Sequence, residues 1–264
     1  MSLLLRPITT TTTTTTSNFF LLPSSKKPLS RLRRRCSMAA TTTTTASSSS
    51  LEEQGQERKE KKLPILLFDV MDTLVRDPFY NDIPQFFKMS MKELLECKHP
   101  TAWVEFEKGQ IDEIQLAKKF FKDGRPFDLE GLKECMVRGY FYIDGMEPLL
   151  QILKEKGYEL HAFTNYPIWY MMIDNKLKLS DYLSWTFCSC KIGKRKPAAD
   201  SYVEVLHHLG VEAASCVFVD DRVENVEAAR NAGMVGLHFR NADSLKQDLF
   251  QLGIELQLET SNRN

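Results

Sequence analysis

The chain has 264 residues, of which 42% are hydrophobic and 27% charged, a composition typical of a globular protein with a sizeable core. It contains no run of 18 apolar residues, so we expect no membrane-spanning helix. The 35 basic residues balance 35 acidic ones, but seven of the basic residues lie in the acid-free stretch 1–51, which leaves a net charge of about −7 for the rest. That excess of acid argues against a nucleic-acid-binding role for the folded part.

The first 50 residues differ in composition from all that follows. They hold two threonine runs, a serine run and an arginine cluster: Thr9–Thr16, Thr41–Thr45, Ser47–Ser50 and Arg31–Arg35. Such a segment buries no core, so we expect it to be disordered. It is typical of an organelle transit peptide, and its β-branched threonines disfavour the arginine helix of a mitochondrial presequence, which favours the chloroplast stroma. A disordered tail on a cytosolic protein is the alternative. Residues 51–62 are interpreted as a charged linker.

Six cysteines show no C-x-x-C pair and no histidine at a matching spacing. We therefore expect neither a zinc site nor a disulfide framework. Cys188 and Cys190 lie in the β-like run Trp185–Cys190, which predicts that both side chains share one face of a strand. Buried small hydrophobic residues are favoured over a redox pair.

After residue 62, short apolar runs alternate with amphipathic stretches. This alternation predicts an α/β fold, a Rossmann-like parallel sheet with helices on both faces. The predicted strands are Pro64–Phe68, Tyr158–Phe163, Trp185–Cys188, Cys216–Val219 and Val235–Phe239. Four helices are expected between these strands. The first runs from about Pro148 to Gly157 and buries Leu149, Ile152 and Leu153, and the second runs from about Pro167 to Leu179. The third ends at Gly210 with Tyr202, Leu206 and Leu209 on one side, and the fourth ends at Gly233 with Val223, Val226 and Ala229 on one side.

About 90 residues separate the first two strands, far more than one crossover helix needs. We interpret residues 78–145 as an inserted helical cap, and residues 63–77 and 146–264 as the α/β core. The expected cap helices are Pro84–Cys97, Ala102–Lys108, Glu113–Lys122 and Leu129–Arg138. Because ligands of open α/β sheets bind beyond the carboxyl ends of the strands, a cap inserted after the first strand would cover the site.

Polar residues follow the predicted strands at the point where each strand ends. They are Asp69, Thr164 with Asn165, Lys194–Lys196, and Asp220 with Asp221. Taken singly, each such residue is more often a helix cap or a turn residue. Together, the carboxylates supply hard oxygen ligands for Mg²⁺, and the hydroxyl and lysine supply donors for a phosphoryl group.

From Leu63 to about Gln251, the chain resembles the haloacid dehalogenase superfamily. The resemblance rests on four motifs and on a cap segment: Phe68–Leu74 (FDVMDTL), Phe163–Asn165 (FTN), Gly193–Pro197 (GKRKP), Phe218–Arg222 (FVDDR) running on to Asn225, and Trp103–Ile111 with Glu107 and Gly109. It implies a sheet with the first-motif strand at its centre, a helical cap, and a magnesium-dependent phosphohydrolase.

The resemblance also implies roles for individual residues. Asp69 would be the nucleophile and a metal ligand, and Asp221 the main ligand of the fourth motif. Asp220 would be an additional ligand or lie just behind the metal. Thr164 and the backbone N–H of Asn165 would bind the phosphoryl group, and Lys196 would neutralise its charge.

Met71 stands where phosphatases of the superfamily have a second aspartate. Its backbone carbonyl can still be a metal ligand, but its side chain supplies no proton. Asp72 follows, and we expect its carboxylate to point away because one helical step rotates a side chain by about 100°. Two alternatives remain: a weak or inactive relative that binds a flavin or a protein, and a metal-independent dehalogenase. The dehalogenase reading is disfavoured because paired Asp220 and Asp221 would repel each other without a cation.

The leader, the cap and the first motif together are similar to those of the flavin mononucleotide (FMN) phosphatases of plant chloroplasts within this superfamily. The resemblance implies hydrolysis of FMN to riboflavin and phosphate. Nothing in the sequence indicates an oligomeric state. Aromatic residues of the cap could stack on a flavin ring, although most of them must form the cap core: Phe79, Tyr80, Phe86, Phe87, Trp103, Phe106, Phe120, Phe121, Tyr140, Phe141 and Tyr142.

Overall fold

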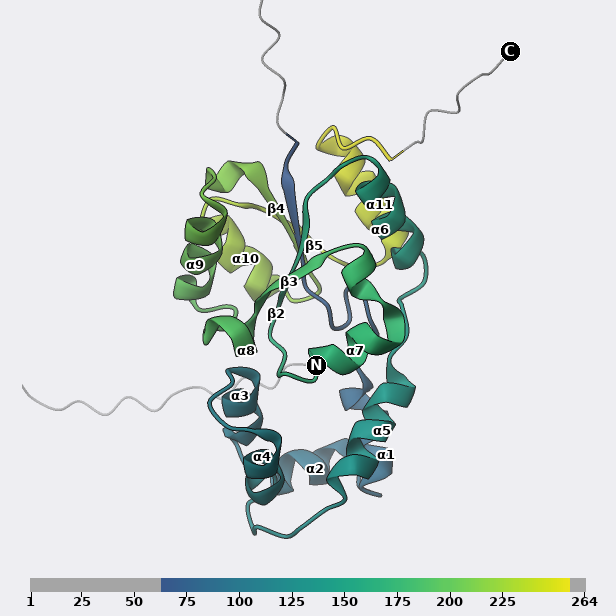
Figure 1. Ribbon diagram of the computed structural model, residues 1–264, viewed down its shortest axis with the longest axis vertical. Helices are drawn as coiled ribbons and strands as arrows, with labels where there is room; N and C mark the ends of the chain where they lie inside the picture. The colour runs from purple at the N-terminus through teal and green to yellow at the C-terminus, as the bar shows by residue number, and fades with distance from the viewer. Residues whose placement is uncertain (1–62, 257–264) are drawn as a thin grey trace, which may run out of the picture. The chain divides into compact units, whose positions relative to one another are not determined.

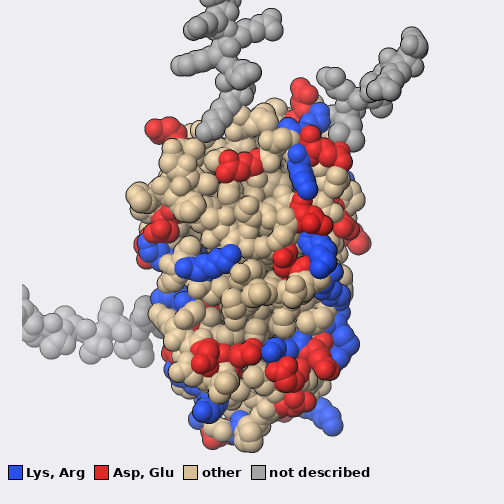
Figure 2. Space-filling view, in the orientation of Figure 1, with Lys and Arg blue, Asp and Glu red and all other residues tan. Residues whose placement is uncertain are grey.

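The computed structural model describes residues 63–256, all within one compact unit, Arg58–Asn264. The predicted transit peptide and the linker lie outside the described residues. Within 63–256, no helix combines the length and the apolar character that crossing a membrane requires. On the face shown in Figure 2, acidic and basic side chains lie interspersed, so the excess acid does not gather in one patch there.

Five parallel strands form one sheet in the order β3-β2-β1-β4-β5, with β1 at its centre (Figure 1). The strands are β1 (Ile65–Phe68), β2 (Leu160–Thr164), β3 (Ser184–Cys188), β4 (Cys216–Asp220) and β5 (Val235–His238). Two 3-10 turns, η2 (Leu179–Asp181) and η3 (Ala213–Ser215), lead into β3 and β4. All five predicted strands are confirmed, with ends that shift by one or two residues.

Helices cover both faces of this sheet, as the sequence predicts (Figure 1). Successive side chains of a strand point to opposite faces, so Leu66 and Phe68 pack in one cluster, while Ile65 and Leu67 pack in the other. The first cluster includes residues of α6 (Met146–Glu155), α7 (Tyr170–Leu177) and α11 (Ala242–Gln251), and the second includes residues of α9 (Ala199–Leu209) and α10 (Val223–Asn231). Each fully buried leucine contributes about 1.5–3 kcal/mol to folding.

Two details of the core helices differ from the expectation. Val223 begins α10 but is exposed, because the buried stripe of this helix starts at Asn225 and Val226. The helix expected from about Pro167 begins only at Tyr170, since Pro167 heads a turn in which its carbonyl accepts the Tyr170 N–H. The helix ends before Lys178, which adopts a left-handed φ of 56°.

The predicted extended run Trp185–Cys190 is wrong beyond Cys188, where a short helix, α8 (Ser189–Ile192), begins. The chain turns there because the Ser189 hydroxyl accepts the Tyr166 N–H at 3.0 Å and donates to the Glu107 carbonyl at 2.5 Å. Cys188 is buried and Cys190 half-buried, with their sulfur atoms 3.5 Å apart. The two cysteines therefore do not share a strand face.

The insertion after β1 folds into short helices: η1 (Pro78–Tyr80), α1 (Asp82–Phe86), α2 (Met91–Cys97), α3 (Ala102–Glu107), α4 (Glu113–Lys119) and α5 (Leu129–Gly139). The single helix predicted over Pro84–Cys97 is wrong. Lys88 has a φ of 54°, which an α-helix does not tolerate, and the Ser90 side chain begins a new helix in a capping box with Glu93. Phe87 packs against the rings of Phe120, Phe121 and Phe127 at the centre of the cap.

Two antiparallel segments connect the core to these helices. The Arg76 N–H donates to the Phe141 carbonyl at 3.0 Å, and the Ile143 N–H donates to the Leu74 carbonyl at 2.9 Å. Because the outgoing and returning segments are paired in this way, we propose 78–145 as the cap domain.

Candidate active site

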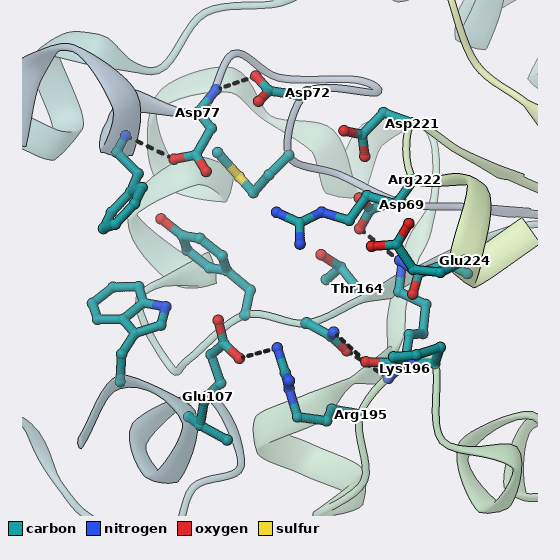
Figure 3. A pocket seen from close by; sticks show the side chains of 18 of the residues that line it. Asp69, Asp72, Asp77, Glu107, Thr164, Arg195, Lys196, Asp221, Arg222 and Glu224 are labelled. Carbon is teal, nitrogen blue, oxygen red and sulfur yellow. Dashed lines mark hydrogen bonds and ion pairs between the residues drawn. The ribbon is translucent and has the colours of Figure 1, made fainter. Parts of the chain in front are cut away.

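Four segments of the core bring polar side chains to the carboxyl edge of the sheet (Figure 3). Asp69 directly follows β1, Thr164 ends β2 and Asp220 ends β4, while Lys196 comes from the loop after α8. A cavity of about 440 Å³ lies between this edge and the cap. Its lining includes Asp69, Thr164 and Asp221 from the core, Asp77 beside the first motif, and Trp103 and Glu107 from the cap.

Lys196 lies at the centre of this cluster. Its Nζ is 3.0 Å from Asp69 Oδ1 and 2.5 Å from Asp220 Oδ2, and its side chain is 1% exposed. Burial alone would lower the pKa of Lys196, but the charges of Asp220 and Asp69 outweigh it and the pKa is raised. Burial raises the pKa of Asp69, and the Lys196 charge opposes that rise. The lysine thus stays cationic and favours the ionised form of Asp69.

The Asn165 side chain fixes the backbone of Lys196. Its Oδ1 accepts the Lys196 N–H at 2.8 Å, and its Nδ2 donates to the Lys196 carbonyl at 2.9 Å. Because both ends of the amide are occupied, only the backbone of Asn165 is left to serve a ligand. The neighbouring Thr164 hydroxyl faces Asp69, yet it is buried without a well-formed hydrogen bond to any residue in 63–256. A buried hydroxyl without a partner suits a ligand oxygen.

The carboxylate of Asp220 is fully buried and fully hydrogen-bonded. It accepts hydrogen bonds from the Lys196 ammonium group, from the backbone N–H of Arg222 at 2.8 Å and from the Asn225 side-chain amide at 3.0 Å. Its oxygens are therefore occupied by protein donors. This supports a role in positioning Lys196 more than a role as a metal ligand.

Asp221 differs from Asp220 in the hydrogen bonding of its carboxylate. Its Oδ1 is buried and accepts no hydrogen bond from the described residues, and its backbone N–H donates to Thr73 Oγ1 at 3.2 Å. Burial, followed by the charges of Asp69 and Asp220, raises the pKa of Asp221 to about 7. An unpaired buried carboxylate is costly unless a cation lies nearby.

The donor set fits a divalent cation. Carboxylate oxygens of Asp69, Asp220 and Asp221 lie within 4.8 Å of one another, although protein donors already occupy those of Asp220. Carboxylate oxygens are the ligands that Mg²⁺ prefers, and the orphaned oxygen of Asp221 needs such a partner. Met71, whose carbonyl the resemblance adds to the set, lines the same cavity.

The loop after the first motif carries two further aspartates. Asp72 has a φ of 56°, and its Oδ1 accepts the Asp77 N–H at 2.9 Å. Asp77 Oδ1 in turn accepts the Phe79 N–H at 2.9 Å, and burial raises the pKa of Asp77 to about 6. Sequence reasoning missed Asp77, because its only signal is that of an aspartate before a proline at a helix start.

The cap contributes charged and aromatic groups to the cavity. Glu107 forms a 3.0 Å ion pair with Arg195 of the third motif, another partner that the sequence did not reveal. Of the aromatic residues proposed as flavin surfaces, only some reach the cavity: Phe79, Tyr80 and Trp103, to which the core adds Tyr166. Most of the others pack within the cap, with one another or against the core.

The comparisons with known proteins agree with this geometry. The family model for haloacid dehalogenase-like hydrolases matches residues 63–233. The chain is 65% identical over 200 residues to the chloroplastic flavin mononucleotide hydrolase 1 of Arabidopsis thaliana, a match that covers 76% of this chain and 82% of that protein. It is 30% identical over 172 residues to the sesquiterpene phosphatase astK of Aspergillus oryzae, covering 62% of this chain and 86% of that one.

A solved structure of a HAD family enzyme from Bacteroides thetaiotaomicron shares the fold. The TM-score is 0.59 at 18% sequence identity, over 72% of this chain and 99% of that one. Sequence motifs, sheet order and family match therefore agree, and the expected fold class and enzyme class are confirmed. The chain belongs to the haloacid dehalogenase-like hydrolase family and is an enzyme of the phosphatase kind.

Proposed function

We propose that this chain is a Mg²⁺-dependent phosphomonoesterase that hydrolyses FMN to riboflavin and phosphate. The reaction class is supported by one arrangement: Asp69 lies 3.0 Å from Lys196, and in the same cluster lie oxygens of Thr164 and Asp221 that have no hydrogen-bond partner among the described residues. A phosphoryl group placed among them would meet a nucleophile, a cation and a hydroxyl donor.

In this proposal a carboxylate oxygen of Asp69 attacks phosphorus, and the bond between phosphorus and the ester oxygen breaks. Water then attacks the phosphorus of the aspartyl-phosphate, which releases phosphate and restores Asp69. Lys196, the Thr164 hydroxyl and the backbone N–H of Asn165 hold the phosphoryl oxygens. Mg²⁺, when bound by Asp69, Asp221 and the Met71 carbonyl, would offset the negative charge of the reacting groups.

Two observations support FMN as the substrate. The relative from Arabidopsis thaliana, 65% identical, is a flavin mononucleotide hydrolase. The cavity, at about 440 Å³, has the size of a small-molecule site, and Tyr80, Trp103 and Tyr166 contribute aromatic side chains to its lining. Such rings can stack on an isoalloxazine.

We place the enzyme in the chloroplast stroma. The same relative is chloroplastic, and residues 1–50 of this chain have the acid-free, hydroxyl-rich and arginine-bearing composition of a transit peptide.

The test is the release of riboflavin and phosphate from FMN by the purified chain in Mg²⁺, with and without a chelator. We expect both products with Mg²⁺ and neither with the chelator. A panel of sugar, nucleotide and aryl phosphates serves to rank the substrates. Absence of turnover on every phosphate, with FMN bound, would instead support an inactive binding protein, and turnover that survives the chelator would support metal-independent chemistry.

A further inference from the structure

The proposed reaction needs a proton that the motif residues do not supply. The alkoxide that leaves FMN is a poor leaving group, so its oxygen must be protonated as the bond to phosphorus breaks. Met71 occupies the place where a carboxyl group would do this, and its thioether carries no proton. The proton donor must therefore come from another group that lines the cavity.

Three acidic residues of the lining are poorly suited to this task. Glu107 is held by Arg195 in a 3.0 Å ion pair; burial raises the pKa of Glu107, and the Arg195 charge opposes that rise. Glu224 is exposed to solvent in the first turn of α10. Asp72 holds the loop after the first motif, because its Oδ1 accepts the Asp77 N–H at 2.9 Å.

Three other groups of the lining that can carry a proton are engaged as well. The hydroxyl of Tyr166 is bonded to that of Tyr140 at 2.7 Å, and burial raises the pKa of Tyr166 well above its ordinary value. Lys196 is held between two carboxylates, which raises its pKa and keeps its protons bound. The hydroxyl of Tyr80 accepts from Arg222 at 3.3 Å.

Asp77 has the required placement. Figure 3 shows it across the cavity from Asp69, on the cap side. In an in-line displacement the leaving oxygen lies on the side of phosphorus opposite the nucleophile, which is the side of Asp77. One of its oxygens accepts the Phe79 N–H, and within the described part of the chain no basic side chain forms an ion pair with it.

We propose that Asp77 is the general acid that protonates the leaving oxygen of the phosphomonoester. Its carboxyl proton passes to the ester oxygen as the bond to phosphorus breaks, and the alcohol leaves neutral. The resulting carboxylate then takes a proton from the water that attacks the aspartyl-phosphate, which restores the starting state. This inference rests on the proposed phosphatase function.

The electrostatic surroundings of Asp77 agree with this role. Burial raises its pKa to about 6, as do the charges of Asp72 and Asp69, whereas the Phe79 N–H and Arg222 oppose the rise. Tyr80, Tyr140 and Tyr166 also face it. A carboxyl group with a pKa near neutrality serves as a proton donor at the pH of a cell.

The test compares two substrates for wild type and Asp77→Asn by kcat/KM, which reports only the steps up to departure of the leaving group. FMN needs an acid, whereas p-nitrophenyl phosphate releases a stable phenolate without one. We expect Asp77→Asn to lower kcat/KM for FMN by about 10²–10⁴-fold and for the aryl ester by less than about tenfold. Asparagine is as good an N-cap as aspartate, so the helix start is retained.

Two further variants complete the design. Asp128→Asn is the matched control, because Asp128 caps α5 through the Gly131 N–H and lies outside the cavity lining, so both rates should equal those of wild type. Adding Met71→Asp to Asp77→Asn should restore FMN hydrolysis at least tenfold.

The outcomes separate the two claims. Equal losses on both substrates in Asp77→Asn, or no loss on either, would overturn the role of Asp77. So would a wild-type enzyme whose rate already falls steeply as the leaving group becomes poorer, a measurement that holds even if the variant does not fold. A wild-type enzyme that leaves FMN and other alkyl phosphates intact would instead contradict the proposed function itself.

Discussion

Asp220 and Asp221 are neighbours in sequence but have opposite surroundings. Protein donors occupy both oxygens of Asp220, whereas Asp221 keeps a buried oxygen that no residue within 63–256 contacts by a hydrogen bond, and its pKa is raised to about 7. Without a cation, Asp221 should therefore reduce the stability of the fold. A folded-state pKa above the ordinary 3.8 means that the folded protein binds more protons than the unfolded one between about pH 4 and 7, so stability falls as the pH rises through this window.

We predict that Asp221→Asn stabilises the metal-free protein at pH 8 by roughly 1–2 kcal/mol, a value reduced to allow for the exposed part of the side chain. At pH 4 the two proteins should be almost equally stable. Mg²⁺ should stabilise the wild type and have less effect on the variant, whose Mg²⁺ requirement for turnover should rise. Urea unfolding at both pH values, with and without Mg²⁺, measures this. Equal stabilisation by Mg²⁺ would place the metal elsewhere.

The end of α3 packs against the start of α8. The Ser189 hydroxyl donates to the Glu107 carbonyl, and Gly109 approaches Cys190 so closely that an added Cβ would lie 2.8 Å from its carbonyl oxygen. Gly109 also has a φ of 66°, which disfavours any residue with a Cβ. This contact joins the cap to the segment that leads to Lys196.

Gly109→Ala should therefore weaken both the fold and turnover. The left-handed backbone costs about 1–2 kcal/mol, and the steric contact adds roughly another 1–3 kcal/mol. Gly124→Ala is the matched control, because Gly124 has a φ of 70° but open space around it, so only the backbone cost should appear. Urea unfolding and FMN hydrolysis compare the pair, and equal effects of the two substitutions would contradict this docking contact.

The sequence predicted the strands of the core and the residues at their ends because both depend on short local patterns. The apolar run Ile65–Phe68 followed by Asp69 needs no knowledge of the partner strands. The break between α1 and α2 was missed, because it depends on the left-handed backbone of Lys88 inside a pattern that reads as continuous helix. Local pattern alone does not reveal such a break.

Contacts between distant segments of the chain account for most of what the sequence did not reveal in the site. The Glu107–Arg195 ion pair and the placement of Asp77 depend on how the cap and the core meet, and the pairing of the Asn165 amide with Lys196 depends on how two loops of the core meet. The sequence motifs include Asn165 and Glu107 but do not indicate which residues these two side chains contact. Asp77 lies outside every motif, so only the cavity lining brings it into consideration.

The cap contributes the aromatic rings of Phe79, Tyr80 and Trp103 to the lining of the cavity. We predict that Trp103→Ala raises the KM for FMN by about 5- to 100-fold, because stacking on a ring contributes about 1–3 kcal/mol. The KM for glycerol 3-phosphate, which has no ring, should change little. Phe250→Ala is the control, since Phe250 is 73% exposed on α11, outside the cavity lining. A similar KM increase for both substrates would exclude flavin stacking.

The proposed transit peptide, residues 1–50, precedes the described part of the chain. Residues 1–60 fused to a fluorescent reporter should direct it into chloroplasts, and removal of these residues should leave the thermal unfolding midpoint unchanged because their composition contributes no packed core. Microscopy of the fusion and a melting curve of the shortened chain measure the two effects. A diffuse cytosolic signal would contradict the plastid assignment.

Phosphate release from FMN by Asp69→Asn tests whether Asp69 is the nucleophile of a phosphatase. The substitution keeps the shape of the side chain but removes both the nucleophile and an anionic metal ligand, while Lys196 retains Asp220 as a partner. With Mg²⁺ present, we predict that wild type releases phosphate and that Asp69→Asn releases at least about 10³-fold less. Release by Asp69→Asn at the wild-type rate would contradict nucleophilic attack by Asp69.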